Sequence, residues 1–295
     1  MEGPMKLIIS SMVFALAMSA QAKHGIMHTI NNMVPMTAPA HIQQENVVYY
    51  GGQVISNVRI YTVYWGGNID ATLKQGLPGF YNAYANSAQI DWMNQYNTHV
   101  HSIDGKAGTD QNIARGSYGG EITINPRNTN VKLQDADIQA ELEYQISQNV
   151  LPKPDANSLF MIHFPAGVSI NIDGQGSCST FCAYHENYAS KVYGDVFYGV
   201  MPDLGSGACA FTCSIGSNAF QSTTFVASHE VAEAVTDPKP TPGSNPAYPQ
   251  AWNTKDGSEI GDLCQQGSTL TAGATVYTIT QLWDNSKNSC STNKF

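Results

Sequence analysis

Runs of β-branched and aromatic residues predict β-strands in three parts of the chain. The segment 47–67, VVYYGGQVISNVRIYTVYWGG, contains two such runs, each followed by a glycine pair. It predicts a strand, a Gly-Gly turn and a longer strand that ends at Trp65. The segments 158–165, SLFMIHFP, and 192–202, VYGDVFYGVMP, each predict a further strand. The first of these is apolar throughout, so we expect it to be buried, with His163 in the core.

Apolar residues at helical spacing predict two helices between these strands. The segment 69–88 contains the first, with apolar positions at Ile69, Leu73, Leu77, Phe80 and Tyr84. Gly76 and Pro78 are expected to break or bend this helix. The second lies in 134–154, where acidic residues near the start and Pro152 near the end mark its limits.

A third helix is predicted in the segment 217–238, SNAFQSTTFVASHEVAEAVTDP. Its apolar residues occupy most sides, which is typical of a buried helix. Ser217 or Ser222 is expected to cap the N-terminus, and Pro238 follows the end.

The order of these elements favours an α/β or α+β fold. Strands alternate with helices, and we find neither repeats nor a clear linker, so residues 45–295 are expected to form a single domain. We expect a mixed sheet with packed helices in a zincin-like layout. In that layout the strand at 192–200 is the edge of the sheet and precedes the third helix.

The N-terminal residues have the organisation of a secretory signal peptide. Lys6 is followed by the apolar run 7–20, LIISSMVFALAMSA, and by small residues that favour cleavage before Lys23. We therefore expect residues 1–22 to be a signal peptide, residues 23–44 to be a flexible leader, and the protein to be secreted. No later apolar run reaches the roughly 20 residues that a membrane-spanning helix needs.

The cysteines all lie in the second half of the chain: Cys178, Cys182, Cys209, Cys213, Cys264 and Cys290. An even number of cysteines behind a signal peptide indicates disulfides. Because sequence neighbours close short loops easily, we expect the pairs Cys178–Cys182, Cys209–Cys213 and Cys264–Cys290. The alternative is a four-cysteine zinc site built from the two CxxxC pairs.

Charge and missing motifs exclude several classes of function. The formal net charge is −9, with 14 Lys and Arg against 23 Asp and Glu, and the basic residues form no cluster. Nucleic acid is therefore not an expected partner, because binding to a phosphate backbone needs clustered Lys and Arg. The chain also lacks the GxSxG, GxxxxGK(S/T) and GxGxxG motifs of serine hydrolases, P-loop proteins and dinucleotide-binding proteins.

The third predicted helix contains HEVAE, residues 229–233, which is the strongest chemical signal in the chain. Residues four apart lie on one helix face, so His229 and Glu233 can hold one ion together. Zinc accepts carboxylate as well as imidazole ligands, and Glu230 stands where zinc hydrolases of the HExxH type have their general base. We therefore expect zinc on His229 and Glu233, with Glu230 catalytic. Calcium is the alternative ion.

A catalytic zinc needs a third protein ligand. The segment 258–264, SEIGDLC, offers Asp262 and Glu259 beside a cysteine that would fix the loop. We expect Asp262 to be this ligand, followed in rank by Glu259, His185 and Asp237.

Two other interpretations of the third helix stay open. Its acids can form a hydrogen-bonded polar cluster without a metal, or they can lie on a solvated face. The apolar residues around them favour burial, and a buried Glu or His needs a partner or an ion. A metal site is therefore the preferred interpretation.

Several short motifs, taken in order, resemble the Exordium / phosphate-induced protein family. They are YYGG…NVRIYTVYWGG, CSTFCAYH, ACAFTC, TDP and LWDNSKNSCST, and they span Val47 to Thr292. The resemblance implies a secreted cell-wall protein, linked in plants to growth and phosphate responses. It carries over the family positions Cys178, Cys182, His185, Cys209, Cys213 and Cys290. It implies no catalytic site, because plant members lack a clear HExxE in the matching helix, so the metal hypothesis rests on the residues of this sequence.

Two functions from different classes follow from these observations. The first is a secreted zinc peptidase or related hydrolase, acting on an extracellular protein, peptide or cell-wall substrate. The alternative is a non-enzymatic protein of Exordium type that binds a cell wall or host surface, with the acids structural or bound to calcium. A third hypothesis is that the leader 23–44 covers the site, as in a zymogen.

Overall fold

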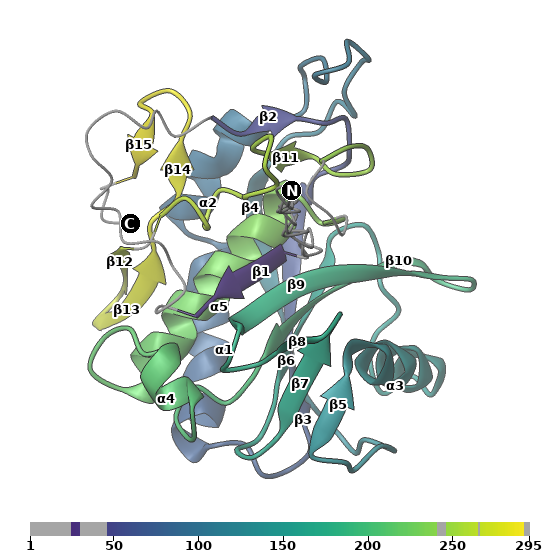
Figure 1. Ribbon diagram of the computed structural model, residues 1–295, viewed down its shortest axis with the longest axis vertical. Coiled ribbons are helices and arrows are strands. Elements are labelled where there is room, and N and C mark those ends of the chain that lie inside the picture. The colour runs from purple at the N-terminus through teal and green to yellow at the C-terminus, as the bar shows by residue number, and fades with distance from the viewer. Residues whose placement is uncertain (1–24, 30–45, 241–245, 265, 292–295) are drawn as a thin grey trace, which may run out of the picture.

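A six-stranded mixed sheet forms the centre of the fold (Figure 1). The computed structural model describes residues 25–29, 46–240, 246–264 and 266–291. The strand order is β1-β9-β10-β6-β3-β4, and β9 runs antiparallel to both of its neighbours, whereas the other pairs are parallel. The strands are β1 (Gly25–His28), β3 (Asn57–Trp65), β4 (Ala114–Ile124), β6 (Ser158–His163), β9 (Phe181–Ser190) and β10 (Gly194–Met201).

Side chains that alternate along β3 build a separate core on each face of the sheet. Ile60 and Tyr64 belong to the core under the helices α1 (Ala71–Ala85) and α5 (Ala219–Thr236). Val63 and Trp65 belong to the core under α3 (Asp135–Ser147) on the opposite face. The architecture is therefore a three-layered α/β arrangement, which agrees with the expected mixed sheet and packed helices.

Short elements surround this sheet. The helical ones are α2 (Ala88–Trp92), the 3-10 helix η1 (Met93–Tyr96) and α4 (Cys209–Thr212). The small sheets pair β2 (Val48–Tyr49) with β11 (Trp252–Asn253), β12 (Gly267–Ala272) with β13 (Thr275–Thr280), β14 (Trp283–Asp284) with β15 (Ser289–Cys290), and β5 (Lys132–Gln134) with β7 (Ser169–Ile172) and β8 (Gln175–Gly176). None of the helices in the described ranges is both long and apolar enough to cross a membrane.

Helix α1 continues through Gly76 and Pro78, so the expected break does not occur. Proline at this position leaves the carbonyl of Lys74, four residues earlier, without its helical amide partner. The hydroxyl of Tyr64 in β3 donates a hydrogen bond to that carbonyl, at 3.4 Å. Gly76 packs against the ring of Phe220, where a Cβ atom would lie 2.4 Å from the ring. Tertiary packing thus compensates for two residues that are unfavourable in an isolated helix.

The structure corrects one predicted cap and one predicted edge strand. Asn218, not Ser217 or Ser222, caps α5, since its side chain accepts a hydrogen bond from the Gln221 amide at 2.9 Å. The strand predicted at 192–200 is β10, which lies inside the sheet between β9 and β6, and its second half is buried on both faces.

The prediction of a flexible leader over 23–44 is wrong for Gly25–Thr29. Residues Gly25–His28 form β1, which pairs with β9 because Ile26 and Met27 bury their side chains on opposite faces of the sheet. The rest of the predicted leader and the whole predicted signal peptide, 1–22, lie outside the described residues.

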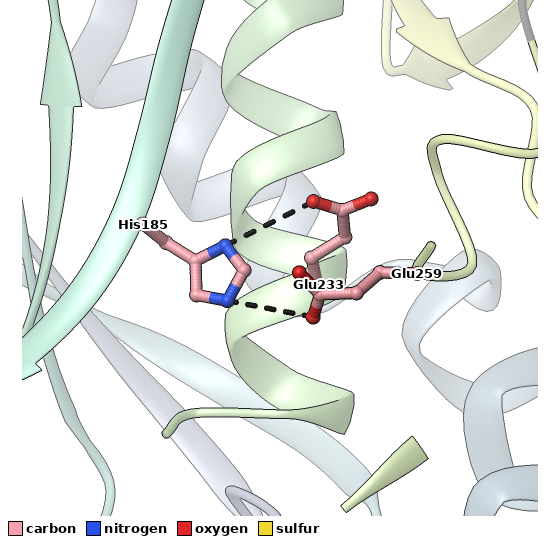
Figure 2. Close-up of side chains that lie close together, drawn as sticks. All are labelled: His185, Glu233 and Glu259. Atoms are coloured by element: carbon pink, nitrogen blue, oxygen red, sulfur yellow. Dashed lines mark ion pairs between the residues drawn. The ribbon is translucent and has the colours of Figure 1, made fainter. Parts of the chain in front are cut away.

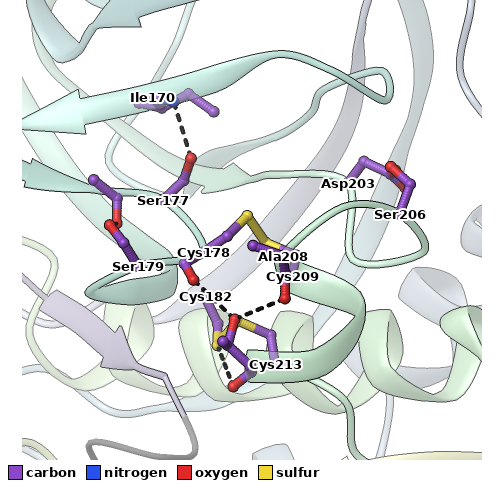
Figure 3. Close-up of a disulfide and its surroundings, with 12 residues drawn as sticks. Ile170, Ser177, Cys178, Ser179, Cys182, Asp203, Ser206, Ala208, Cys209 and Cys213 are labelled. Carbon is purple, nitrogen blue, oxygen red and sulfur yellow. Dashed lines mark hydrogen bonds between the residues drawn. A yellow bond between two sulfur atoms is a disulfide. The ribbon is translucent and has the colours of Figure 1, made fainter.

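The disulfides are Cys178–Cys209 and Cys182–Cys213, which lie side by side (Figure 3), and Cys264–Cys290. None of the cysteines is free. Only the third predicted pair is confirmed, and the four-cysteine zinc alternative is wrong. The two CxxxC segments pair crosswise because one helical turn, α4, lies against the start of β9. Residues four apart on that turn project from the same side, so each meets a cysteine of the opposite segment. Two parallel bridges thereby tie β9 to the segment that leads into α5.

Peptide mapping without reductant tests this crosswise pairing. Chymotrypsin cleaves after Phe181 and Phe211, which separate the two cysteines of each CxxxC segment. We expect linked fragments that join Cys178 to Cys209 and Cys182 to Cys213. Mass spectrometry identifies them, and fragments that link each CxxxC segment only to itself would contradict the fold at this corner.

Buried His163 predicts a specific pH dependence of stability. Its Nε2 lies 2.9 Å from the Tyr81 hydroxyl, and burial lowers the pKa of His163 from 6.5 to about 3. Between these values the unfolded chain binds a proton that the folded chain does not, so the free energy of unfolding falls as the pH drops from 6.5 towards 3. Glutamine at position 163 keeps a partner for Tyr81 and does not titrate. We expect His163→Gln to lose this part of the pH dependence in urea unfolding, and parallel curves for the two proteins would count against it.

Candidate metal centre

Helix α5 is the buried centre of the site. It packs against the sheet strands β1, β9 and β10, against α1 and against β13, so every residue from Ser222 to Thr236 is buried. His229 is 1% exposed, and Glu230 and Glu233 are fully buried. The interpretation of these side chains as a solvated helix face is therefore wrong. Buried ionisable groups need compensation by hydrogen bonds, opposite charges or an ion.

His229 and Glu233 lie on one face of α5, as their spacing predicts. The distance from His229 Nε2 to Glu233 Oε1 is 3.0 Å, and Asp262 Oδ1 lies 3.7 Å from the same nitrogen. One ligand atom from each of the three residues falls within 4.8 Å of the others. The structure thus brings together the three residues that the sequence suggested as ligands.

The loop that carries Asp262 is fixed directly to Glu233. The amides of Gly261 and Asp262 both donate to Glu233 Oε1, at 3.1 and 3.0 Å. A Cβ atom on Gly261 would lie 2.7 Å from His229 Nδ1 and 2.8 Å from Glu233 Oε1. Only glycine therefore lets the loop backbone approach the helix this closely.

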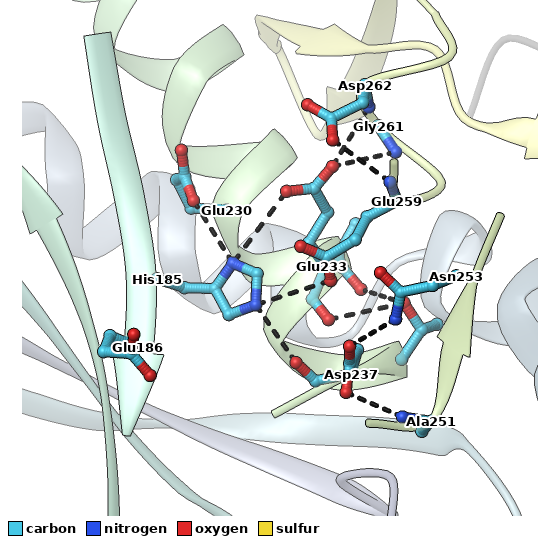
Figure 4. A network of polar contacts seen from close by, with 12 residues as sticks. His185, Glu186, Glu230, Glu233, Asp237, Ala251, Asn253, Glu259, Gly261 and Asp262 are labelled. Carbon is cyan, nitrogen blue, oxygen red and sulfur yellow. Dashed lines mark hydrogen bonds and ion pairs between the residues drawn. The ribbon is translucent and has the colours of Figure 1, made fainter. Parts of the chain in front are cut away.

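His185, from β9, occupies the middle of the cluster (Figures 2 and 4). Its Nδ1 lies 3.4 Å from Glu230 Oε2 and 3.8 Å from Glu233 Oε2, and its Nε2 lies 3.6 Å from Glu259 Oε1. Its Nε2 also donates to the Asp237 carbonyl at 3.0 Å, so Nδ1 carries the lone pair that faces the carboxylates. Burial lowers the pKa of His185 to about 3, which keeps the ring neutral. His185, Glu233 and Glu259 form a second set of possible ligands that shares Glu233 with the first.

The sequence ranked His185 only third among the extra ligands, although one signal pointed to it. His185 follows Cys182 by three residues, and Cys182 is linked to Cys213 ahead of α5. The crosswise pairing of the cysteines, which was not predicted, is what brings this strand position to the helix.

Asp237 does not join the cluster through its carboxylate. Its Oδ1 accepts a hydrogen bond from the Ala251 amide at 2.8 Å, and its Oδ2 accepts one from Asn253 Nδ2. The side chain is therefore held by the segment 251–253 and fixes the end of α5 to β11 (Figure 4).

Burial and mutual repulsion govern the ionisation of the acids. Burial raises the pKa of Glu230 and of Glu259 well above the usual range, and the charge of Glu233 adds to both shifts. Burial and Glu233 also raise the pKa of Asp262 to about 6. Burial disfavours protonation of His229, but the charge of Glu233, whose Oε1 lies 3.0 Å from His229 Nε2, outweighs this effect and raises the pKa of His229. The carboxylates thus disfavour one another's charge, and a bound cation would reverse that effect.

Buried polar atoms without hydrogen bonds concentrate in this cluster. In the described ranges ten buried side-chain nitrogen and oxygen atoms have no such partner, and seven of them lie here. They are His185 Nδ1, His229 Nδ1 and Nε2, Glu230 Oε1 and Oε2, Glu233 Oε2 and Glu259 Oε1. Within those ranges, the ion pairs of these acids and Asp262 are with histidines, never with Lys or Arg. Each unsatisfied group costs about 1–3 kcal/mol, so a fully unpaired set would be strongly destabilising.

The donor set fits zinc better than calcium. It combines imidazole nitrogen with carboxylate oxygen, which zinc accepts, whereas calcium takes oxygen ligands alone. The separations of 3.0 to 3.7 Å between His229 Nε2 and the two carboxylates are those of ligand atoms that surround a common centre.

No protein-family model matches this chain, and no curated protein matches it. The resemblance to the Exordium family therefore stays a prediction from short motifs.

Substitution of Gly261 tests the geometry of the site. We expect Gly261→Ala to push the loop away from α5 and to weaken zinc binding by at least about tenfold, because the new methyl group overlaps His229 and Glu233. Gly67→Ala is the matched control, since a Cβ atom there meets nothing within 4 Å. Titration against a competing chelator measures both affinities. Equal affinities in the two variants would show that the loop takes no part in binding.

Proposed function

We propose that this protein is a zinc-dependent hydrolase that acts on peptides. The single observation that carries the proposal is the cluster of buried, unpartnered histidine and carboxylate atoms around Glu233, with no Lys or Arg paired to it in the described ranges. Such an assembly is costly as it stands, and a divalent cation would neutralise it.

We assign His229, Glu233 and Asp262 as the ligands. Two groups of three possible ligand residues share Glu233, and both have suitable spacing. They differ in their access to solvent. The Asp262 side chain is 23% exposed, whereas His185 and Glu259 are at most 3% exposed. A catalytic ion must reach water and substrate, which favours the set that includes Asp262.

The remaining residues have roles in proton transfer and positioning. A bound zinc ion would lower the pKa of a water molecule in its open position. Glu230 follows the ligand His229 on α5, and its Oε2 lies 3.4 Å from His185 Nδ1. We assign Glu230 as the general base. His185 is a positioning residue, because its ring is fixed by the Asp237 carbonyl and presents Nδ1 to Glu230.

A peptide is the favoured substrate because of the strand beside the site. Antiparallel β9 carries His185 and runs along α5, so an extended chain in the place that β1 occupies beside β9 would pass the cluster. The zincin-like layout stays part of this proposal, and the buried helix α5 with its HExxE sequence beside the mixed sheet supports it, although β10 is not the edge strand that this layout predicted.

The three disulfides support an oxidising, extracellular location. They agree with the secretion that the N-terminal sequence suggests, and with an extracellular protein, peptide or cell-wall substrate.

A pocket on the α3 face favours a second candidate function. Its volume is about 720 Å³, and polar side chains of Asp135, Asn171, Glu186, Asn187 and Asp195 line it. Hydroxyl-rich ligands such as glycans suit a lining of this kind, so the pocket supports the non-enzymatic, cell-wall-binding alternative. Binding of soluble glycans with no cleavage of peptides would favour that alternative.

The variant Glu230→Gln tests the proposed catalysis. We expect it to keep bound zinc and to lose at least about 100-fold in peptide cleavage, because glutamine cannot accept the proton. Glu143→Gln is the control, since Glu143 lies on α3 and accepts hydrogen bonds from Tyr188 and Ser190. Cleavage of a fluorogenic peptide library measures activity. Full activity in Glu230→Gln would exclude this residue as the base.

A further inference from the structure

The strand β1 occupies the position where a peptide would approach the cluster. It is the outermost strand of the sheet, pairs antiparallel with β9 and packs against α5 (Figure 1). An edge strand presents unpaired backbone groups that can bind another extended chain. In this protein β1, a strand of the same chain, pairs with the backbone groups along the outer edge of β9.

Gly25 and Met27 of β1 lie on the face of the sheet that carries the site, whereas Ile26 lies on the opposite face. Gly25 pairs with His185, Ile26 with Tyr184 and Met27 with Ala183. Burial raises the pKa of both Glu230 and Asp262, and β1 counteracts part of this effect: the Met27 backbone amide lowers the pKa of Glu230, and His28 lowers that of Asp262.

Gly25 is the position with the strictest requirement. A Cβ atom there would lie 1.8 Å from Cε1 and 2.1 Å from Nδ1 of His185. Any side chain would therefore displace the imidazole that faces Glu230 and Glu233. The side chains of the two following residues point to opposite faces of the sheet: Ile26 is buried in the core under α3, and Met27 in the core under α5.

We propose that the outer edge of β9 is a docking strand for extended peptides that carry glycine opposite His185, and that β1 is its resident, inhibitory occupant. The catalytic meaning of this inference rests on the proposed hydrolase function, but the binding step does not need the metal. A substrate must displace β1 and repeat its pattern: glycine, then two apolar residues on opposite faces.

The competing explanation is that β1 is a permanent part of the sheet. In that case weakening β1 would destabilise the fold without creating a binding site. The two explanations therefore differ in whether a free peptide can replace β1.

The test uses the full chain with its own β1 weakened. The double variant Ile26→Asp/Met27→Asp places two charges at buried positions and should release β1, and Met27→Ala is the milder form if the double variant does not fold. The probe is a fluorescent peptide with the sequence of residues 23–29, KHGIMHT. The matched control peptide has valine in place of the glycine that corresponds to Gly25.

We expect the probe to bind the released variant at least about tenfold more tightly than the wild type, because only the variant has a free β9 edge. The valine peptide should not bind. Equal binding to both proteins, no binding to a folded variant, or equal binding of the two peptides would overturn the inference.

A second readout separates this inference from the proposed function. Zinc is added to the released variant, and cleavage of longer peptides that contain the probe sequence is measured. Selective binding without cleavage contradicts the hydrolase but supports the docking strand. Cleavage at the same rate in wild type and variant supports the hydrolase but overturns the inhibitory role of β1.

Discussion

The carboxylate of Glu233 is the group on which the arrangement of the site depends. One of its oxygens accepts two backbone amides from the loop at Gly261 and Asp262, and the same oxygen lies 3.0 Å from His229. The other oxygen faces His185 on β9 and has no hydrogen bond. Helix, loop and strand therefore meet at one buried acid. Hydrogen bonds from two amides offset part of the energetic cost of burying this carboxylate, and a bound cation would offset the remaining cost.

Covalent links hold the three segments that meet at this acid. Cys182, three residues before His185, is bonded to Cys213 ahead of α5, and Cys178–Cys209 lies beside it. Cys264, two residues after Asp262, is bonded to Cys290. Repulsion between buried carboxylates would push strand, helix and loop apart. Disulfides next to each segment oppose that tendency, so the cross-links stabilise a site that is unfavourable by itself.

Local features of the site could be predicted from the sequence, and non-local ones could not. The positions of His229 and Glu233 follow from helical geometry alone, and a loop fixed by Cys264 suggested Asp262. The place of His185 depends on cysteines that pair across 31 residues of sequence, and the local spacing of CxxxC gave the wrong partners. Strand β1 has four residues, which are too few for a periodic sequence signal. It forms a strand because Ile26 and Met27 are buried against segments distant in the sequence. The continuation of α1 through Pro78 likewise depends on the hydrogen bond from Tyr64 to the Lys74 carbonyl. Helix propensities do not include such a tertiary contact.

Elemental analysis of the purified full chain measures whether the cluster around Glu233 binds a metal ion. The protein is offered zinc, and excess metal is removed before the measurement, alongside Glu233→Gln, in which the side-chain oxygen can still accept the Gly261 and Asp262 amides. We expect about one zinc ion per chain in the wild type and none in the variant. Wild-type protein that retains no metal would contradict this expectation, and the buried acids would then be a polar cluster stabilised by protonation alone.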